Sequence, residues 1–188
     1  DFAYAKQLGF RIKLVGTAEP GRMPRMQTCL LPMSTQLAKV DGVLNAVEFD
    51  ADPIGSVVLT GPGAGSGATS SAVLSDLVDL ACDRIPFTFG RPVAALADGS
   101  AVENGGGPDT PFYVRLMVVD KPGVLADITS VLQIHDISVE SMLQQGRAPQ
   151  DTVALVLATH EVGVERLMTA LSEIESLSCV MAAPVAMP

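Results

Sequence analysis

The sequence has no tryptophan, few basic residues and no long apolar run, and the last two shortages each argue against a class of protein. Of the 188 residues, 12 are Lys or Arg and 21 are Asp or Glu, which gives a formal net charge of −9. This acidic balance argues against nucleic acid and anionic membranes as partners. Apolar residues make up 48% of the chain, but no run of them is long enough for a membrane span.

Cysteine is also scarce. Cys29, Cys82 and Cys179 are widely separated, each in an apolar context, and an odd number at such spacing does not suit a disulfide framework. Neither His135 nor His160 has the close Cys or His neighbour that a zinc cluster needs. We therefore expect buried thiols, a cytoplasmic protein and no metal site.

The chain begins at Asp1, within a helical pattern and without the features of a secretory signal. This beginning suggests a piece of a longer protein. The length leaves room for two small domains. Glycine and proline concentrate between them, in a segment with few apolar residues, as is typical of a domain boundary. We expect a first domain at 1–87, a linker at 88–110 and a second domain at 111–188.

Hydrophobic periodicity in the first domain predicts helices and strands. The expected helices are 1–8 and 68–85, and the expected strands are 10–18, 27–31, 43–49 and 56–60. The last two strands are separated by a short segment with Pro and Gly, which indicates a hairpin. Together the strands suggest a mixed or antiparallel sheet with one face open to helices.

A glycine-rich loop at 61–67 precedes the helix expected at 68–85. Backbone amides of such a loop and of a helix N-terminus can hold a phosphate. The spacing matches neither the G-x-G-x-x-G fingerprint nor a P-loop. Two interpretations stay open: nucleotide contact, and a structural loop that lets the helix pack tightly on a sheet.

The second domain is organised around the sequence Asp-Lys-Pro-Gly-Val-Leu at 120–125. An alternating run at 112–119 predicts a strand before it, and the apolar spacing of 124–135 predicts a helix after it. Pro122 suits the first turn of a helix, and Gly123 has no Cβ, so a ligand can approach the backbone closely. The first amides of the helix lack internal partners, which favours an anion such as the carboxylate of a free amino acid. The alternative is a strand–turn–helix corner without a ligand.

Further patterns predict strands at 137–143, 152–159 and 178–182 and a helix over 164–174. The resulting order is βαββαβ, the ferredoxin-like unit. With the hallmark turn at 120–125, residues 111–188 resemble an ACT domain, the small-molecule sensor appended to many amino-acid biosynthetic enzymes. The fold class expected for the chain is α+β, with a partial mixed-sheet domain before the ACT domain.

The ACT resemblance implies an effector site where two such domains pair. Backbone groups of Pro122, Gly123, Val124 and Leu125 would face the effector carboxylate. Asp120 would take its ammonium group, and Ser138 and Gln144 would line the other side. ACT sensors commonly have an Asn near the end of the first helix, where this chain reads His-Asp-Ile-Ser at 135–138. This departure leaves the effector open, with threonine as the expectation and a pairing module without a ligand as the alternative.

A second resemblance covers the first domain. Residues 1–14, 40–47 and 61–65 with 68–77 resemble, in order, segments late in the catalytic part of bacterial homoserine dehydrogenases. This family reduces aspartate semialdehyde to homoserine with NADPH or NADH, in threonine, methionine and isoleucine biosynthesis. The resemblance implies a homo-oligomer. It also implies that the Rossmann domain and the catalytic lysines lie outside this chain, so no catalytic residue is assigned. Lys6 and Lys13 are expected to be ordinary solvated lysines.

In the family, the last glycine of the Gly-x-Gly-Ala-Gly run reaches the nicotinamide cofactor. That glycine corresponds to Gly65, and Gly63 is a second candidate. Most cofactor contacts would come from the absent domain, so this chain alone is expected to be inactive. The alternative is a non-catalytic amino-acid sensor or oligomerisation module of another biosynthetic enzyme. The glycine loop with Asn45 favours the dehydrogenase.

Overall fold

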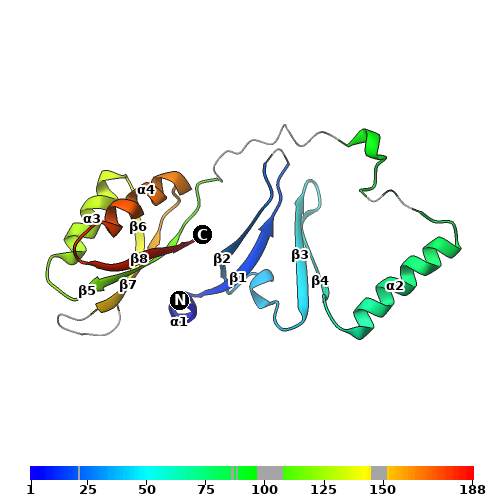
Figure 1. Ribbon diagram of the computed structural model, residues 1–188, viewed down its shortest axis with the longest axis horizontal. Coiled ribbons are helices and arrows are strands. Elements are labelled where there is room, and N and C mark those ends of the chain that lie inside the picture. The colour runs from blue at the N-terminus through cyan, green and yellow to red at the C-terminus, as the bar shows by residue number, and fades with distance from the viewer. Residues whose placement is uncertain (21, 86, 88, 97–107, 145–151) are drawn as a thin grey trace. The chain divides into compact units, whose positions relative to one another are not determined.

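The computed structural model describes residues 1–20, 22–85, 87, 89–96, 108–144 and 152–188 (Figure 1). The chain forms two compact units. Unit 1 consists of Asp1–Pro32 with Glu103–Pro188, and unit 2 is Met33–Val102. The first 32 residues therefore share a unit with the C-terminal part of the chain. This grouping differs from the domain division at 1–87 and 111–188 expected from the sequence.

The C-terminal part of unit 1 has the predicted βαββαβ order. Its elements are β5 (Tyr113–Val119), α3 (Val124–Ile134), β6 (Val139–Gln144), β7 (Thr152–Thr159), α4 (Val164–Glu175) and β8 (Val180–Met187). The strands form one antiparallel sheet in the order β6-β7-β5-β8. The expected α+β class is confirmed, whereas the turn expected at 146–150 lies outside the described residues.

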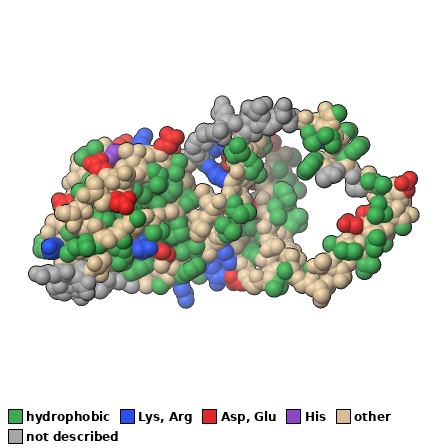
Figure 2. All heavy atoms as spheres, viewed as in Figure 1, with side chains coloured by type: hydrophobic (Ala, Val, Ile, Leu, Met, Phe, Trp, Pro, Cys, Tyr) green, Lys and Arg blue, Asp and Glu red, His purple; other side chains and the backbone are tan. Residues whose placement is uncertain are grey.

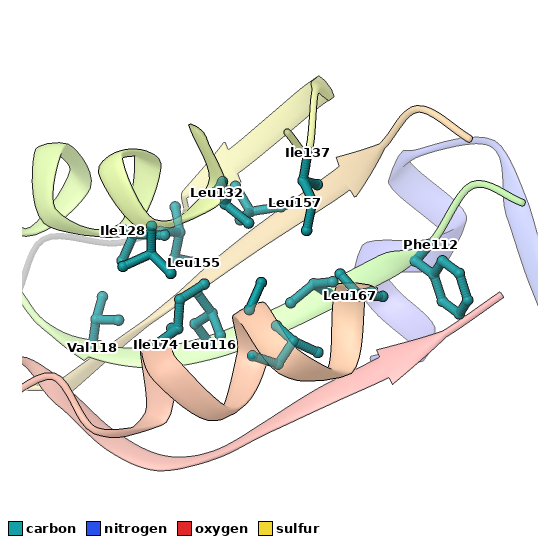
Figure 3. Packing of buried hydrophobic residues seen from close by; sticks show 14 of the residues in the cluster. Phe112, Leu116, Val118, Ile128, Leu132, Ile137, Leu155, Leu157, Leu167 and Ile174 are labelled. Carbon is teal, nitrogen blue, oxygen red and sulfur yellow. The ribbon is translucent and has the colours of Figure 1, made fainter. Parts of the chain in front are cut away.

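Helices α3 and α4 cover one face of this sheet (Figure 3). Strand alternation explains which residues face them: Val114, Leu116 and Val118 of β5 belong to the core shared with the helices. From the helices, Ile128 and Leu167 are completely buried in the same core. Complete burial of one such side chain contributes about 1.5–3 kcal/mol, so this core is the main source of stability in unit 1.

The N-terminal part of unit 1 contains α1 (Phe2–Gln7), β1 (Phe10–Thr17) and β2 (Arg25–Pro32). The two strands pair antiparallel over their full length, from Phe10 opposite Pro32 to Thr17 opposite Arg25. Strand β2 is longer than expected because pairing with β1 continues into residues 25 and 26. The other face of the β5–β8 sheet carries a second apolar cluster, to which α1, β1 and β2 contribute.

Unit 2 contains η1 (Leu37–Lys39), β3 (Leu44–Ala51), β4 (Gly55–Pro62), α2 (Ser66–Ala81) and η2 (Val93–Ala95). The predicted hairpin of β3 and β4 is confirmed. It forms a two-stranded sheet of its own, as β1 and β2 do, so the described strands before residue 63 form two antiparallel pairs and not one sheet. Helix α2 has no buried residue, and its apolar side chains lie on the surface (Figure 2).

The expectation of buried thiols is wrong for Cys82, which is exposed at the C-terminal end of α2. Cys29 and Cys179 are half-buried, and all three cysteines are free. Burial raises the pKa of the Cys29 thiol. Among the helices that the structure describes, none is both long and apolar enough to cross a membrane.

Candidate functional site

The turn between β5 and α3 has the geometry that its sequence predicts. The Lys121 amide donates to the Val119 carbonyl at 2.9 Å, which ends the strand with a tight bend. Gly123 is the residue before α3 and has φ +97°. An L side chain is strained at this φ, so glycine is required here for the backbone conformation.

The N-terminus of α3 is open. No side chain among the described residues caps the helix, and a Cβ placed on Gly123 would meet nothing within 4 Å. The first amides of a helix carry the positive end of its dipole, so a carboxylate is stabilised there. The turn therefore offers space and donors to an anion.

The predicted effector residues of this turn differ in what they offer. Pro122 and Gly123 are exposed, so their backbone is accessible. The Val124 side chain is buried in the helix-facing core, which leaves only its backbone for a ligand. Leu125 is 41% exposed and places an apolar side chain beside the turn. Asp120 is half-buried at the end of β5, where its carboxylate could accept hydrogen bonds from an ammonium group.

The structure does not bring all predicted effector residues together within one domain. Strands β5 and β6 are both antiparallel to β7, so they run parallel to each other. Gln144, at the C-terminal end of β6, therefore lies at the same end of the sheet as Asp120. With β7 between the two strands, their separation across the sheet is about 10 Å.

Ser138 lies at the opposite end of the sheet, before the start of β6. Helix α3 separates it from the turn, and its 11 residues span about 16 Å. Ser138 cannot contact a single amino acid held at the turn of its own domain. A site that includes both needs a second copy of the domain, as the ACT resemblance implies.

Ser138 lines an open pocket of about 280 Å³ at the C-terminal end of α3. The other residues that line it are Thr129, Leu132, Gln133, Asp136, Ile137 and Val139. Thr129, Gln133 and Asp136 were not selected from the sequence. Their spacing places three polar side chains on one face of the end of α3, and this pattern could have indicated them.

Asp136 replaces the glycine that usually ends a helix in this way. Its φ is +52°, and its amide donates to the Gln133 carbonyl at 3.0 Å. The Ile137 amide donates to the Leu132 carbonyl at 2.9 Å. These two bonds form a Schellman end, which turns the chain sharply so that Ser138 and β6 can follow.

In the glycine-rich loop of unit 2, the two candidate cofactor residues, Gly63 and Gly65, are glycine for different structural reasons. The Gly63 amide donates to the Val43 carbonyl at 2.9 Å, which extends the hairpin of β3 and β4 by one bond. A Cβ on Gly63 would overlap the side-chain amide of Asn45. Gly63 is therefore required by close packing against Asn45, a residue of the facing strand.

Gly65 precedes α2 and has φ +119° and ψ 154°, a conformation accessible mainly to glycine. A Cβ built there would meet nothing within 4 Å, so the space in front of α2 is open. No side chain of the described residues caps α2. The loop thus presents an exposed backbone and a helix N-terminus, as a cofactor contact requires, and the open space also agrees with a loop that has no ligand.

The fold and the turn of the C-terminal part define a class of small-molecule-sensing domain. The ACT domain family model matches residues 112–179, and the model of the homoserine dehydrogenase family matches residues 1–78. The chain belongs to the homoserine dehydrogenase family and includes an ACT domain.

Curated relatives and solved structures agree with this assignment. A homoserine dehydrogenase of Neisseria gonorrhoeae is 34% identical over 190 residues, covering 96% of this chain and 43% of the relative. One of Pseudomonas aeruginosa is 35% identical over 188 residues, covering 94% and 43%. The crystal structure of a homoserine dehydrogenase from Thiobacillus denitrificans matches the whole chain and 44% of its own, with 33% identity and a TM-score of 0.77. The chain thus spans less than half the length of these relatives.

Proposed function

We propose that this chain is the ACT-containing regulatory part of a homoserine dehydrogenase. The whole enzyme would interconvert L-homoserine and L-aspartate 4-semialdehyde in the cytoplasm, with NADP or NAD as cofactor. Residues 1–87 would belong to its catalytic and dimerisation domain, 88–110 to a linker and 111–188 to the ACT domain. The observation that carries the proposal is that the family match and the ACT match follow each other in one chain.

The proposed effector is L-threonine, an end product of the pathway, bound between two ACT domains. The backbone amides of Gly123, Val124 and Leu125 would donate to its carboxylate, which would lie against Pro122, and Asp120 would hold its ammonium group. Ser138 of a second copy would complete the site, because α3 holds it about 16 Å from the turn of its own domain. The working protein is therefore proposed to be a homo-oligomer.

Gly65, with Gly63 as the second candidate, is proposed to approach the nicotinamide cofactor by its backbone. Neither carries chemistry of its own, so their contribution would be close approach without a Cβ. Because the chain spans less than half of its relatives, we expect it to show no turnover alone. The intact gene product should oxidise homoserine, and its failure to do so would favour a non-catalytic amino-acid sensor.

Calorimetric titration of this chain with L-threonine tests the effector site. L-isoleucine, L-methionine and L-phenylalanine serve as comparisons. We expect saturable threonine binding that Asp120→Asn weakens by about tenfold or more, because a hydrogen bond to a charged group is worth about 1.5–3 kcal/mol. Glu165→Gln makes the same acid-to-amide change in the first turn of α4, at an exposed position, and should leave binding unchanged.

A melting curve of each variant separates lost binding from lost folding. Gly123→Asp is less suitable as a test, because φ +97° would strain any L side chain there. Equal threonine affinity in the folded wild type and the folded Asp120→Asn variant would remove Asp120 from the site. No binding of any amino acid here, and no inhibition of the intact enzyme, would overturn the sensor function.

A further inference from the structure

Strand alternation gives the ACT sheet of unit 1 two apolar faces, and the helices cover only one of them. Tyr113 of β5, Val156 of β7 and Met187 of β8 form the buried cluster on the other face. Tyr4 and Leu8 next to it come from the α1 segment, and other partly buried members come from β1 and β2, namely Ile12 and Leu30. Val156 is 0% exposed although α3 and α4 are on the opposite face, so the N-terminal segment provides its cover.

A polar contact fixes the N-terminal segment to this face. The Tyr113 hydroxyl donates to Asp1 Oδ1 at 2.8 Å, and Arg115 Nε donates to the same oxygen at 2.6 Å. The Arg115 and Asp1 side chains are only 22% and 26% exposed, so water screens this pair less than a surface pair. Burial raises the pKa of the Tyr113 hydroxyl. A tyrosine hydroxyl is a neutral donor at physiological pH even without this shift.

The backbone adds a further connection. The Leu30 amide of β2 donates to the Pro188 carbonyl at 2.7 Å, directly after β8. Residues matched by the homoserine dehydrogenase family and residues matched by the ACT family thus share apolar packing and an ion pair within one compact unit, and the backbone hydrogen bond joins Leu30 to Pro188, beyond the ACT match.

Strand β5 joins this contact to the candidate effector turn. It carries Tyr113 and Arg115 near its N-terminal end. Asp120 follows Arg115 by five residues, which corresponds to about 17 Å along the strand. β5 is a central strand that pairs in continuous register with β7 from Tyr113 to Val119, whereas its pairing with β8 has register shifts between Arg115 and Val118; the pairing with β7 links the two ends of the strand. A displacement of the turn would therefore move the strand and the Asp1 contact together.

We propose that Asp1, Tyr113 and Arg115 are coupling residues, which transmit effector binding at the 120–125 turn to residues 1–32 of the catalytic-domain segment. The proposal rests on the proposed sensor function for its ligand, but its route is set by contacts within unit 1. Regulation along this route does not need the linker at 88–110. A ligand shifts such an equilibrium only by its different affinity for the two states, so breaking the contact should separate binding from its distant effect.

Hydrogen–deuterium exchange of the whole chain tests this, with the backbone amides of residues 2–17 as reporters. Saturating L-threonine should slow their exchange by about five- to hundred-fold in the wild type, the usual size of coupling between sites. In Asp1→Asn and Tyr113→Phe, calorimetry should still detect threonine binding, while residues 2–17 no longer respond. Glu19→Gln is the matched control, because Glu19 lies in the same segment and its ion pairs among the described residues are with Arg22 and Arg25 of that segment and not with Tyr113 or Arg115.

A second arm needs no ligand. Gly123→Ala strains the turn, because its φ is +97°, and should change the exchange of residues 2–17 in the wild-type background but not in Asp1→Asn. A response that survives Asp1→Asn and Tyr113→Phe would overturn the coupling route, as would bound threonine without any effect on residues 2–17. If no amino acid binds this chain and none inhibits the intact enzyme, the sensor function fails, and the Gly123→Ala arm alone decides the route.

Discussion

The two compact units use similar residues with very different results. In unit 1, apolar side chains of β5, α3, β7 and α4 form a continuous core, and several are completely buried. In the described part of unit 2, Ala38 is the only buried hydrophobic residue. Leucines and valines of α2 remain more than half exposed, and the helix is less amphipathic than α3 or α4.

The difference shows that an apolar stripe forms a core only when its fold supplies a second layer. In unit 1 the sheet supplies that layer for α3 and α4. Unit 2 has a two-stranded hairpin and one helix of 16 residues, and isolated elements of this kind are marginal in water. The exposed apolar surface of unit 2 is what a segment of a larger catalytic domain would present.

The largest expected effect is a difference in the free energy of unfolding between two leucine-to-alanine substitutions, one in each unit. Leu167 in α4 is completely buried, whereas Leu77 in α2 is 55% exposed. Leu167→Ala should lower the free energy of unfolding by about 2–5 kcal/mol, because it leaves a cavity in the core. Leu77→Ala should change it by no more than about 0.5 kcal/mol, and alanine is an equally good helix former.

Denaturant unfolding followed by circular dichroism measures both variants. The two leucines have the same chemistry and both lie within helices, so their difference reports burial alone. A loss for Leu77→Ala similar to that for Leu167→Ala would mean that α2 has a buried face in solution, and the contrast between the units would then be incorrect.

A second and smaller contrast uses the residues that end two helices. Asp136 after α3 and Asp83 after α2 both have positive φ, +52° and +53°, and both close a Schellman end. Glycine removes the left-handed strain and also a negative charge at the helix C-terminus. Asp136→Gly should therefore stabilise unit 1 by about 1 kcal/mol.

Asp83→Gly removes the same strain. Because α2 has no buried residue, a more stable helix end there should not stabilise a hydrophobic core. We expect more helix signal at 222 nm and no change in the midpoint of unit 1 unfolding. Equal shifts of the midpoint in both variants would show that the two units unfold as one cooperative block.

The smallest expected difference is in the reactivity of two cysteine thiols, and its measurement requires no substitution. Cys82 of unit 2 is exposed, whereas Cys29 of unit 1 is half-buried and burial raises its pKa. Less thiolate is present at a given pH when the pKa is raised, so Cys29 should react with iodoacetamide more slowly than Cys82, and its rate should keep rising at alkaline pH. Peptide mass spectrometry over time gives both rates, and faster labelling of Cys29 at pH 7 would contradict the assignment.

The local sequence pattern was sufficient to predict most helices and strands. Alternation at 112–119 and helical spacing at 124–135 predicted β5 and α3 to within a residue, and glycine and proline located the turn between them. The βαββαβ order followed because only a few topologies suit such a sequence of elements. The hairpin of β3 and β4 was predicted for the same local reason, a turn segment between two alternating runs.

Contacts between distant residues could not be read in this way. The spacing of Val73, Leu77 and Leu80 predicts an apolar face, but only the structure shows that this face is exposed. Likewise, the sequence cannot show that a Cβ on Gly63 would overlap Asn45, or that Ser138 and the 120–125 turn lie at opposite ends of α3. Each of these depends on how elements pack, which no single stretch encodes.

The sequence by itself thus determined the elements of this chain, the glycine turn after β5 and the family to which both halves are similar. The tertiary structure decided which segments pack together in one compact unit. It placed residues 1–32 on the helix-free face of the ACT sheet, where Asp1 meets Tyr113 and Arg115. The physical reason is that periodicity records which face of an element is apolar, whereas only packing determines which distant segment buries that face.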